Sequence, residues 1–391
     1  MTFKIIALIV MFSSFLVTGI VYPFVLRYAK RRHILDNPNE RKVHRSPVPL
    51  LGGIAVWTGI VAGSIATLLL MHLHTFSVTT LAMTLMLIVG TIDDIKGLTP
   101  TVRFLVEILV IWLLTALLHY HIDSFHGLWH TGSLSAFVAI PLSILAGVGI
   151  INAVNLIDGV DGYSSGFGIM AALLFSVIFR KAGMIPMACI SFSIAGGLIP
   201  FFLHNVFGYD SKMYIGDGGT LMLGTAMAEF VFSVLYSRSP CIRFVEQGIG
   251  LVPMVLAIMS IPVFDTLRVM IARIRRGKSP FVADKTHLHH LFLEFGFSHI
   301  GTTMIILAMN LSIFSAWYVS WKLGASIDLQ FYIVVGLSLL ATVFFYRFMY
   351  AQLEKESRVC KIMRRIGAAT HRERSGLWNL MRRFSDRFDI K

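Results

Sequence analysis

Long apolar stretches separated by short polar segments make up most of this chain. A membrane-spanning helix needs roughly 20 predominantly apolar residues, and eleven stretches meet that requirement. They lie near residues 4–27, 50–71, 76–92, 102–120, 134–155, 165–180, 184–206, 215–237, 247–272, 301–321 and 328–350. The pattern predicts an all-α polytopic membrane protein with about 11 transmembrane helices. We expect residues 1–350 to form a membrane-embedded domain and residues 351–391 a basic tail.

Composition supports this interpretation. Hydrophobic residues make up 56% of the chain and charged residues 14%, whereas a soluble domain carries about a quarter charged residues. The net charge of +13 would suit nucleic acid, anionic lipid or an anionic substrate, and its location decides among them. Cys189, Cys241 and Cys360 lie far apart and form no metal-binding or redox spacing.

Basic residues are concentrated on one side of the predicted membrane domain. The connections on that side and the tail hold 27 Lys and Arg residues, and the other side holds 6. Because cytoplasmic loops carry the excess of Lys and Arg, we expect the N-terminus outside and the C-terminus in the cytoplasm. No segment is typical of a nucleic-acid-binding module, and the basic tail indicates contact with membrane lipids.

The unusual polar clusters all fall at the predicted cytoplasmic ends or loops. They are residues 41–45, 93–96, 152–161, Asn205 with 216–219, and 284–290. An ion-coupled transporter would place such groups near the bilayer midplane. Their gathering at one face instead favours a single enzyme site.

Asp93 and Asp94 end the third predicted span. Carboxylates at a helix C-terminus face the negative end of the helix dipole, which costs about 0.3–1 kcal/mol each. We therefore expect a bound cation or a proton-accepting role, with a solvated helix end as the alternative.

The segment from Asn152 to Gly162 is the most specific signal in the chain. Asn152, Asn155 and Asp158 recur at every third position, so on a helix they would share one face. Asp161 follows them, and glycines permit tight turns close to a ligand. A polar helix cap would explain one such residue, but not all of them.

The sequence Gly216-Asp217-Gly218-Gly219 opens the eighth span at its cytoplasmic end. Free N–H groups at a helix N-terminus favour phosphate binding. Asp217 there suits a Mg²⁺ ion held jointly by protein and substrate phosphates.

Two further clusters are basic. His287, His289 and His290 could suggest a metal site, but the neighbouring Arg and Lys residues favour phosphate or nucleotide contact. Lys42 and His44 lie in a charged loop whose local features would be explained by membrane topology alone.

In their order along the chain, these motifs resemble the polyprenyl-phosphate N-acetylhexosamine-1-phosphate transferases. The resemblance covers roughly residues 35–300. It rests on Asp36-Asn-Pro with Arg41-Lys42-x-His44, Pro49-x-x-Gly52-Gly53, Asp93-Asp94, Asn152-x-x-Asn155-x-x-Asp158-Gly-x-Asp161-Gly, Gly216-Asp217-x-Gly219 and His287-x-His289-His290.

The resemblance implies roles for individual residues. Asp93, Asp94, Asp158 and Asp161 would be catalytic, and Asp217 would bind the metal. The substrate-binding residues would be Lys42, His44, Arg103, Asn152, Asn155, Asn205, His287, His289 and His290. The family often has Lys three residues after its second Asp, whereas Lys96 comes two residues after Asp94. Arg103 is the alternative to Lys96 as the basic residue of this motif.

The resemblance also implies the reaction and its partners. A UDP-N-acetylhexosamine would donate its sugar phosphate to undecaprenyl phosphate at the cytoplasmic face of the bacterial inner membrane and release UMP. The cofactor would be Mg²⁺, with Mn²⁺ as an alternative. Leu288 interrupts the histidine run, which resembles the branch that uses UDP-N-acetylglucosamine to start surface polysaccharides. A homodimer and a covalent aspartyl intermediate remain open.

Overall fold

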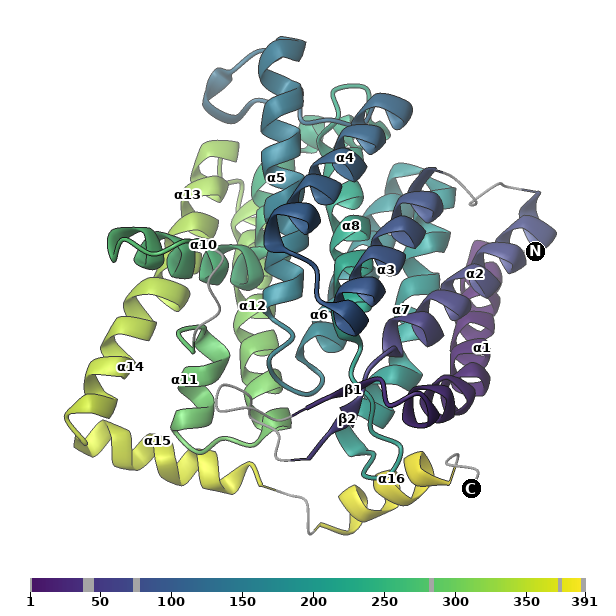
Figure 1. Ribbon diagram of the computed structural model, residues 1–391. Helices are drawn as coiled ribbons and strands as arrows, with labels where there is room; N and C mark the ends of the chain where they lie inside the picture. The colour runs from purple at the N-terminus through teal and green to yellow at the C-terminus, as the bar shows by residue number, and fades with distance from the viewer. Residues whose placement is uncertain (1, 38–45, 73–77, 281–284, 372–374, 388–391) are drawn as a thin grey trace.

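The fold is a bundle of long helices, shown in Figure 1. The computed structural model describes residues 2–37, 46–72, 78–280, 285–371 and 375–387. Within them, ten helices are long and apolar enough to cross a membrane. They are α1 (Phe3–Arg31), α2 (Gly52–Met71), α3 (Val78–Lys96), α4 (Pro100–Leu118), α5 (Ala136–Leu156), α6 (Tyr163–Ala182), α7 (Ile185–Phe207), α8 (Gly216–Leu235), α12 (His299–Lys322) and a final helix over Ile327–Glu354.

The shorter elements connect and flank this bundle. The final long helix consists of α13 (Ile327–Leu339), a π-helical turn (Leu340–Phe344) and α14 (Phe345–Glu354). The other short elements are β1 (Leu35–Asp36), β2 (Val48–Pro49), η1 (Leu128–His130), η2 (Pro240–Gln247), α9 (Leu251–Ile258), α10 (Ser260–Arg275), α11 (Leu288–Glu294), α15 (Arg358–Ala369) and α16 (Gly376–Asp386). Strands β1 and β2 pair antiparallel. The prediction of a polytopic all-α membrane protein is confirmed.

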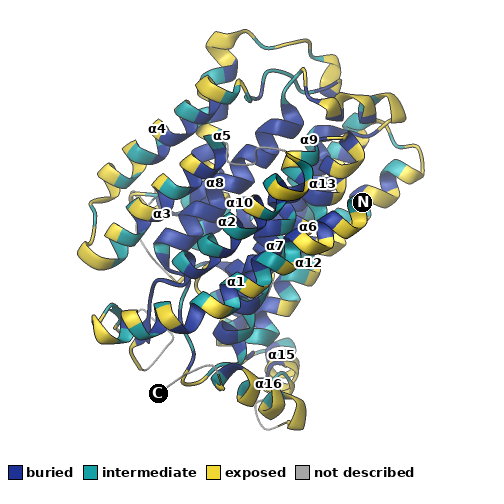
Figure 2. Cartoon of the chain, turned by 90° about the vertical axis from the view of Figure 1, so that its right-hand side faces the viewer, coloured by how far each residue is buried: buried dark blue, intermediate teal, exposed yellow. Residues whose placement is uncertain are grey.

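Helix α8 forms the centre of the bundle. Every residue from Gly218 to Leu235 is buried, while the outer helices keep apolar side chains exposed, as a lipid-facing surface requires (Figure 2). Glycines let neighbouring helices reach the α8 backbone. A Cβ on Gly90 of α3 would lie 2.5 Å from Gly218 Cα, and one on Gly53 of α2 would lie 2.5 Å from Gly219 Cα.

The predicted ninth span, residues 247–272, was wrong as a single helix. The chain bends by 106° between η2 and α9, α9 ends at Ile258, and α10 begins at Ser260 and lies across the other helices (Figure 1). Pro262 has no N–H to donate to the Ile258 carbonyl. Instead the Asn310 amide donates to that carbonyl over 2.9 Å and accepts from the Ile261 N–H over 3.0 Å. A broken helix is tolerated at membrane depth because a neighbouring side chain satisfies its backbone.

Candidate functional site

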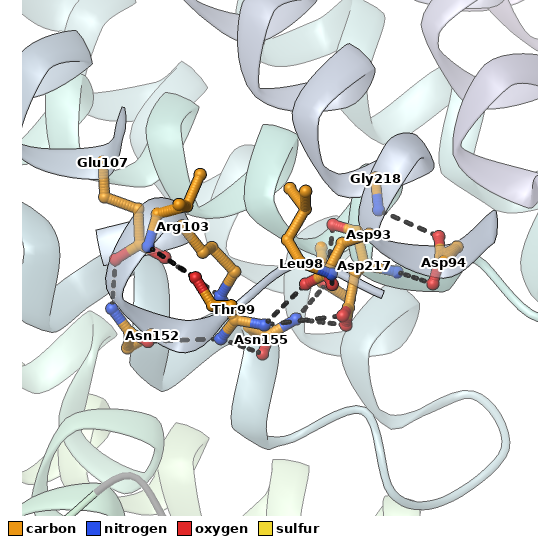
Figure 3. A network of polar contacts seen from close by, with 12 residues as sticks. Asp93, Asp94, Leu98, Thr99, Arg103, Glu107, Asn152, Asn155, Asp217 and Gly218 are labelled. Atoms are coloured by element: carbon orange, nitrogen blue, oxygen red, sulfur yellow. Dashed lines mark hydrogen bonds and ion pairs between the residues drawn. The ribbon is translucent and has the colours of Figure 1, made fainter. Parts of the chain in front are cut away.

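Four helix ends meet at one end of the bundle. They are the C-terminal ends of α3 and α5 and the N-terminal ends of α4 and α8. Because α3 and α8 touch through Gly90 and Gly218, the residues that follow Gly90 on α3 lie beside the first turn of α8. Segments distant in sequence thereby place their polar side chains together (Figure 3).

Arg103, in the first turn of α4, is at the centre of this cluster. Its Nη1 lies 3.4 Å from Asp217 Oδ2 and 3.5 Å from Asp93 Oδ2. Its Nη2 donates to Asn155 Oδ1 over 3.1 Å and to Asn152 Oδ1 over 3.4 Å. The predicted residues Asp93, Asn152, Asn155 and Asp217 are therefore brought together around one guanidinium (Figure 3).

Glu107 holds this arginine from behind and was not among the predicted residues. Its side chain is 1% exposed, and Oε1 lies 3.3 Å from Arg103 Nε. Its Oε2 accepts a hydrogen bond from the Asn152 amide. The i,i+4 spacing of Arg103 and Glu107 on a helix was a readable signal for this ion pair.

Asp94 has a different environment from its neighbour Asp93. Its carboxylate accepts from the Asp217 N–H over 3.0 Å and from the Gly218 N–H over 3.3 Å. Asp94 thus occupies the positive end of the α8 dipole, which offsets its unfavourable position at the end of α3. Asp93 instead accepts from the Leu98 N–H over 2.6 Å and faces Arg103.

Asp217 combines fixed geometry with access to solvent. The Asn155 amide donates to its Oδ1 over 2.8 Å and also to Thr220 Oγ1 over 2.8 Å. Its side chain nevertheless remains 38% exposed, so a ligand can reach it.

The donor set fits a hard divalent cation. The carboxyl groups of Asp93, Asp94, Glu107 and Asp217 outnumber the single Arg103 guanidinium, and Asp93 and Asp217 approach each other closely. Among the described residues, no three acidic, histidine or cysteine side chains form a metal cluster. Mg²⁺ is commonly held by one or two carboxylates with substrate phosphates rather than by a protein cage, and this arrangement suits that mode.

Asp158 lies beyond α5 rather than on it. The helix ends at Leu156, so the prediction that Asp158 shares a helix face with Asn152 and Asn155 was wrong. Asp158 accepts a hydrogen bond from the Ser164 hydroxyl. Its side chain reaches solvent, yet the protein packed around it and the charge of Asp217 raise the pKa of its carboxyl to about 7.

Asp161 is held by two basic side chains. Its Oδ2 lies 2.6 Å from Lys212 Nζ and 2.9 Å from His299 Nδ1. Burial acts to raise the pKa of Asp161, but the His299 hydrogen bond and the Lys212 charge outweigh it, so the pKa is lowered. Lys212 and His299 were missed because each stands outside any motif.

Asn205 is buried behind the same loop. Its Oδ1 accepts from the Gly162 N–H over 2.7 Å, and its amide donates to the Met213 carbonyl over 3.0 Å. Both ends of this amide therefore join the segment after α5 to the segment before α8. This geometry gives Asn205 a role in positioning these two segments, and its contact with substrate stays a prediction.

The histidine motif lies against the Asp158 segment. A Cβ on Gly159 would lie 2.3 Å from His289 Nε2, so the glycine permits this contact. His289 is buried, and its Nε2 has no hydrogen-bond partner among the described residues; burial lowers its pKa well below the usual range. The His290 ring lies 4.3 Å from that of His289.

His287 is anchored by Asp265 of α10. Its Nδ1 lies 3.0 Å from Asp265 Oδ2, and the Leu288 N–H donates to the same oxygen over 3.1 Å. Asp265 also pairs with Arg268, whose Nε lies 3.1 Å from Oδ1. Asp265 and Arg268 therefore form an ion pair on α10, and the same carboxylate fixes the histidine loop.

Three further basic residues were named from the sequence: Lys42, His44 and Lys96. Lys42 and His44 fall outside the described residues. Lys96 is exposed, whereas Arg103, the alternative to it, lies between Asp93 and Asp217.

The sequence of this chain is similar to a known family and to several known proteins. The family model described as Glycosyl transferase family 4 matches residues 76–235. A probable undecaprenyl-phosphate N-acetylglucosaminyl 1-phosphate transferase of Bacillus subtilis is 28% identical over 84% of this chain and 90% of its own length. A decaprenyl-phosphate N-acetylglucosaminephosphotransferase of Mycobacterium leprae is 30% identical over 71% of this chain and 74% of its own length. An undecaprenyl-phosphate alpha-N-acetylglucosaminyl 1-phosphate transferase of Escherichia coli is 26% identical over 73% of this chain and 76% of its own length.

The match to the family model includes Asp93, Arg103 and Asp217. The chain therefore belongs to glycosyl transferase family 4, the family of the polyprenyl-phosphate N-acetylhexosamine-1-phosphate transferases.

Proposed function

We propose that this protein transfers N-acetylglucosamine-1-phosphate from UDP-N-acetylglucosamine to undecaprenyl phosphate. An oxygen of the lipid phosphate attacks the β-phosphorus of the UDP-sugar. The bond from that phosphorus to the bridging oxygen breaks, and UMP leaves with this oxygen. The names of the three relatives above support this choice of donor and acceptor.

The observation that carries the proposal is the exposed Asp217 carboxylate at the start of α8. It lies between Asp93, Arg103 and Asn155 at a helix N-terminus. The first N–H groups of α8 already bind Asp94, so this position offers a carboxylate for a cation that would in turn bind the phosphates. Phosphoryl transfer requires mainly this kind of positioning and charge stabilisation.

Some residues of the site would hold the cation, and others would position the carboxylates or face the phosphates. Asp217 and Asp93 would hold Mg²⁺, which would neutralise charge on the diphosphate when bound. Arg103 would orient the Asp93 and Asp217 carboxylates, and Asp158 would face the incoming phosphates. Since a phosphate monoester has its second pKa near 6, the lipid phosphate is mostly dianionic at neutral pH. Orientation of this nucleophile should therefore matter more than its deprotonation.

The histidine loop would contact the nucleotide side of the donor. His289 lies against Gly159, next to Asp158, and His290 lies beside His289. Lys42 and His44, which stand in the sequence between β1 and β2, would add basic groups.

We further propose that this site faces the cytoplasm of a bacterial inner membrane. The excess of Lys and Arg on the site's side of the bundle supports this orientation. The product would then be the first lipid-linked intermediate of a cell-surface polysaccharide.

The direct test is UMP release by the purified protein with undecaprenyl phosphate. We expect turnover with UDP-N-acetylglucosamine and Mg²⁺, loss of turnover in excess chelator, and recovery when Mg²⁺ is added back. UDP-N-acetylmuramoyl-pentapeptide should not support release. Comparable turnover of the pentapeptide donor would reverse the choice of donor sugar. Full activity in excess chelator would show that the reaction does not need Mg²⁺.

A further inference from the structure

The C-terminal helix α16 docks where a spanning helix leaves the bundle. The Trp378 ring lies 4.8 Å from the ring of Phe207, the last residue of α7. The Arg382 guanidinium lies 4.3 Å from the centre of the Tyr209 ring. Since α7 ends on the same side of the bundle as the start of α8, α16 lies at the end of the bundle that carries the site (Figure 1).

The docked face of α16 holds the segment that leads into α8. Asp386 Oδ1 accepts from the Tyr209 N–H over 3.0 Å, from the Ser211 N–H over 3.1 Å and from the Ser211 hydroxyl over 2.9 Å. The next residue, Lys212, pairs with Asp161 of the site. A single carboxylate on the tail thus fixes the backbone from which an active-site lysine extends.

The exposed face of α16 combines apolar and basic side chains. Leu377, Leu380 and Phe384 are 71%, 63% and 51% exposed, and their spacing places them on one side of the helix. Arg383 and Arg387 are also exposed and lie beside this apolar strip. An exposed leucine, leucine and phenylalanine next to arginines is typical of a helix that lies in a lipid headgroup region.

We propose that α16 binds the anionic membrane surface through this exposed face and thereby holds the Tyr209–Ser211 backbone in place beside the active site. The position of α16 at the end of a spanning helix favours a membrane as the occupant over a soluble protein. The strip and the arginines supply the apolar and charged contacts that an anionic bilayer offers. Lipid composition would then act on the Lys212 side of the site.

The two amides that donate to Asp386 are direct reporters of this docking. The test measures hydrogen exchange at Tyr209 and Ser211 in the full chain, in nanodiscs of phosphatidylcholine and in an equal mixture of phosphatidylcholine and phosphatidylglycerol. We expect slower exchange at both amides in the anionic nanodiscs. This readout needs no turnover, so it stands or falls separately from the proposed transferase activity.

Substitutions separate membrane docking from folding. Each basic residue near an anionic surface contributes roughly fivefold to binding, so Arg383→Gln with Arg387→Gln should weaken docking by about thirtyfold. Exchange in this variant should no longer respond to phosphatidylglycerol. Asp386→Ala should raise exchange at both amides in either lipid.

The matched control removes two exposed basic residues from the opposite end of the bundle, Arg238→Gln with Lys322→Gln, and should keep the wild-type response. Equal exchange of the wild type in both nanodiscs would refute the proposal. An unchanged lipid response in the Arg383 and Arg387 double variant would refute it as well.

Discussion

Two buried glutamates on spanning helices show what distinguishes the candidate site from the rest of the bundle. Glu107 on α4 and Glu229 on α8 are each 1% exposed. Glu107 contacts Arg103 and Asn152, which belong to a network that reaches solvent at Asp217. Glu229 accepts a hydrogen bond from Thr79, and its Oε2 has no hydrogen-bond partner in the described part of the chain.

The difference lies in position along the helices. Glu229 is 12 residues beyond Asp217 on α8, which is about 18 Å along the axis. At that depth a single carboxyl meets one hydroxyl, whereas at the helix ends charged groups from four helices converge. Burial of an acidic residue in a membrane protein is therefore weaker evidence for function than convergence of such residues with an exposed member.

The largest effect should come from the exposed member of the network. Asp217→Asn removes the carboxylate that we assign to Mg²⁺, and we expect UMP release to fall by at least about 10³-fold because charge stabilisation is the main catalytic contribution. The remaining activity should depend less on Mg²⁺ concentration. A Mg²⁺ response like that of the wild type would exclude Asp217 as a metal ligand.

Arg103→Lys should have the next largest effect. Lysine keeps the charge but cannot reproduce contacts to two carboxylates and two amides with one planar group. We expect a loss of about 10²-fold in kcat, with unchanged expression and membrane insertion. Lys96→Gln, which removes an exposed charge near the same helix end, serves as the control and should change kcat little.

A pair of glutamine substitutions tests the comparison directly. Glu107→Gln should lower kcat by about tenfold, because it frees the guanidinium on which the acidic groups are arranged. Glu229→Gln should leave kcat within about twofold, since a neutral amide can still accept from Thr79. We would measure kcat and KM separately for both. Equal losses in the two variants would mean that burial, and not convergence, determines function.

A smaller effect should appear in the pH profile. Ser164 donates a hydrogen bond to Asp158, and this bond acts to lower the pKa of the Asp158 carboxyl, which the protein packed around it and the charge of Asp217 raise to about 7. If the ionised form is active, kcat/KM should fall as the pH drops through this value. Ser164→Ala should move that acidic limb to higher pH. Ser176→Ala, on the same helix, should leave the limb in place.

The spanning helices could be predicted because their signal is local. An apolar stretch of sufficient length specifies a helix wherever it occurs. The break at Met259 could not be predicted in this way, since it depends on the Asn310 amide, which reaches Ile258 from another helix. Likewise, Asn152, Asn155 and Asp158 recur at every third position in the sequence, but α5 ends at Leu156, so Asp158 lies beyond the helix.

The members of the site were easier to predict than their roles. Asp93, Asn155 and Asp217 stand in motifs and are brought together as expected. Asp94 and Asn205 stand in motifs too, but they bind backbone groups of neighbouring segments. Such roles depend on which helix ends become neighbours, which no single stretch of sequence reveals.

The glycine contacts of α8 have a consequence for inhibitor design. Gly53 and Gly90 place main chain against main chain, so the spacing of the acidic groups is set by backbone atoms and not by side chains of adjustable length. A slip of α8 by one residue would move Asp217 by about 1.5 Å and separate it from Asn155. We expect few mutations to make the enzyme resistant to a compound matched to this spacing, because the protein has few ways to move the acidic groups apart and remain folded.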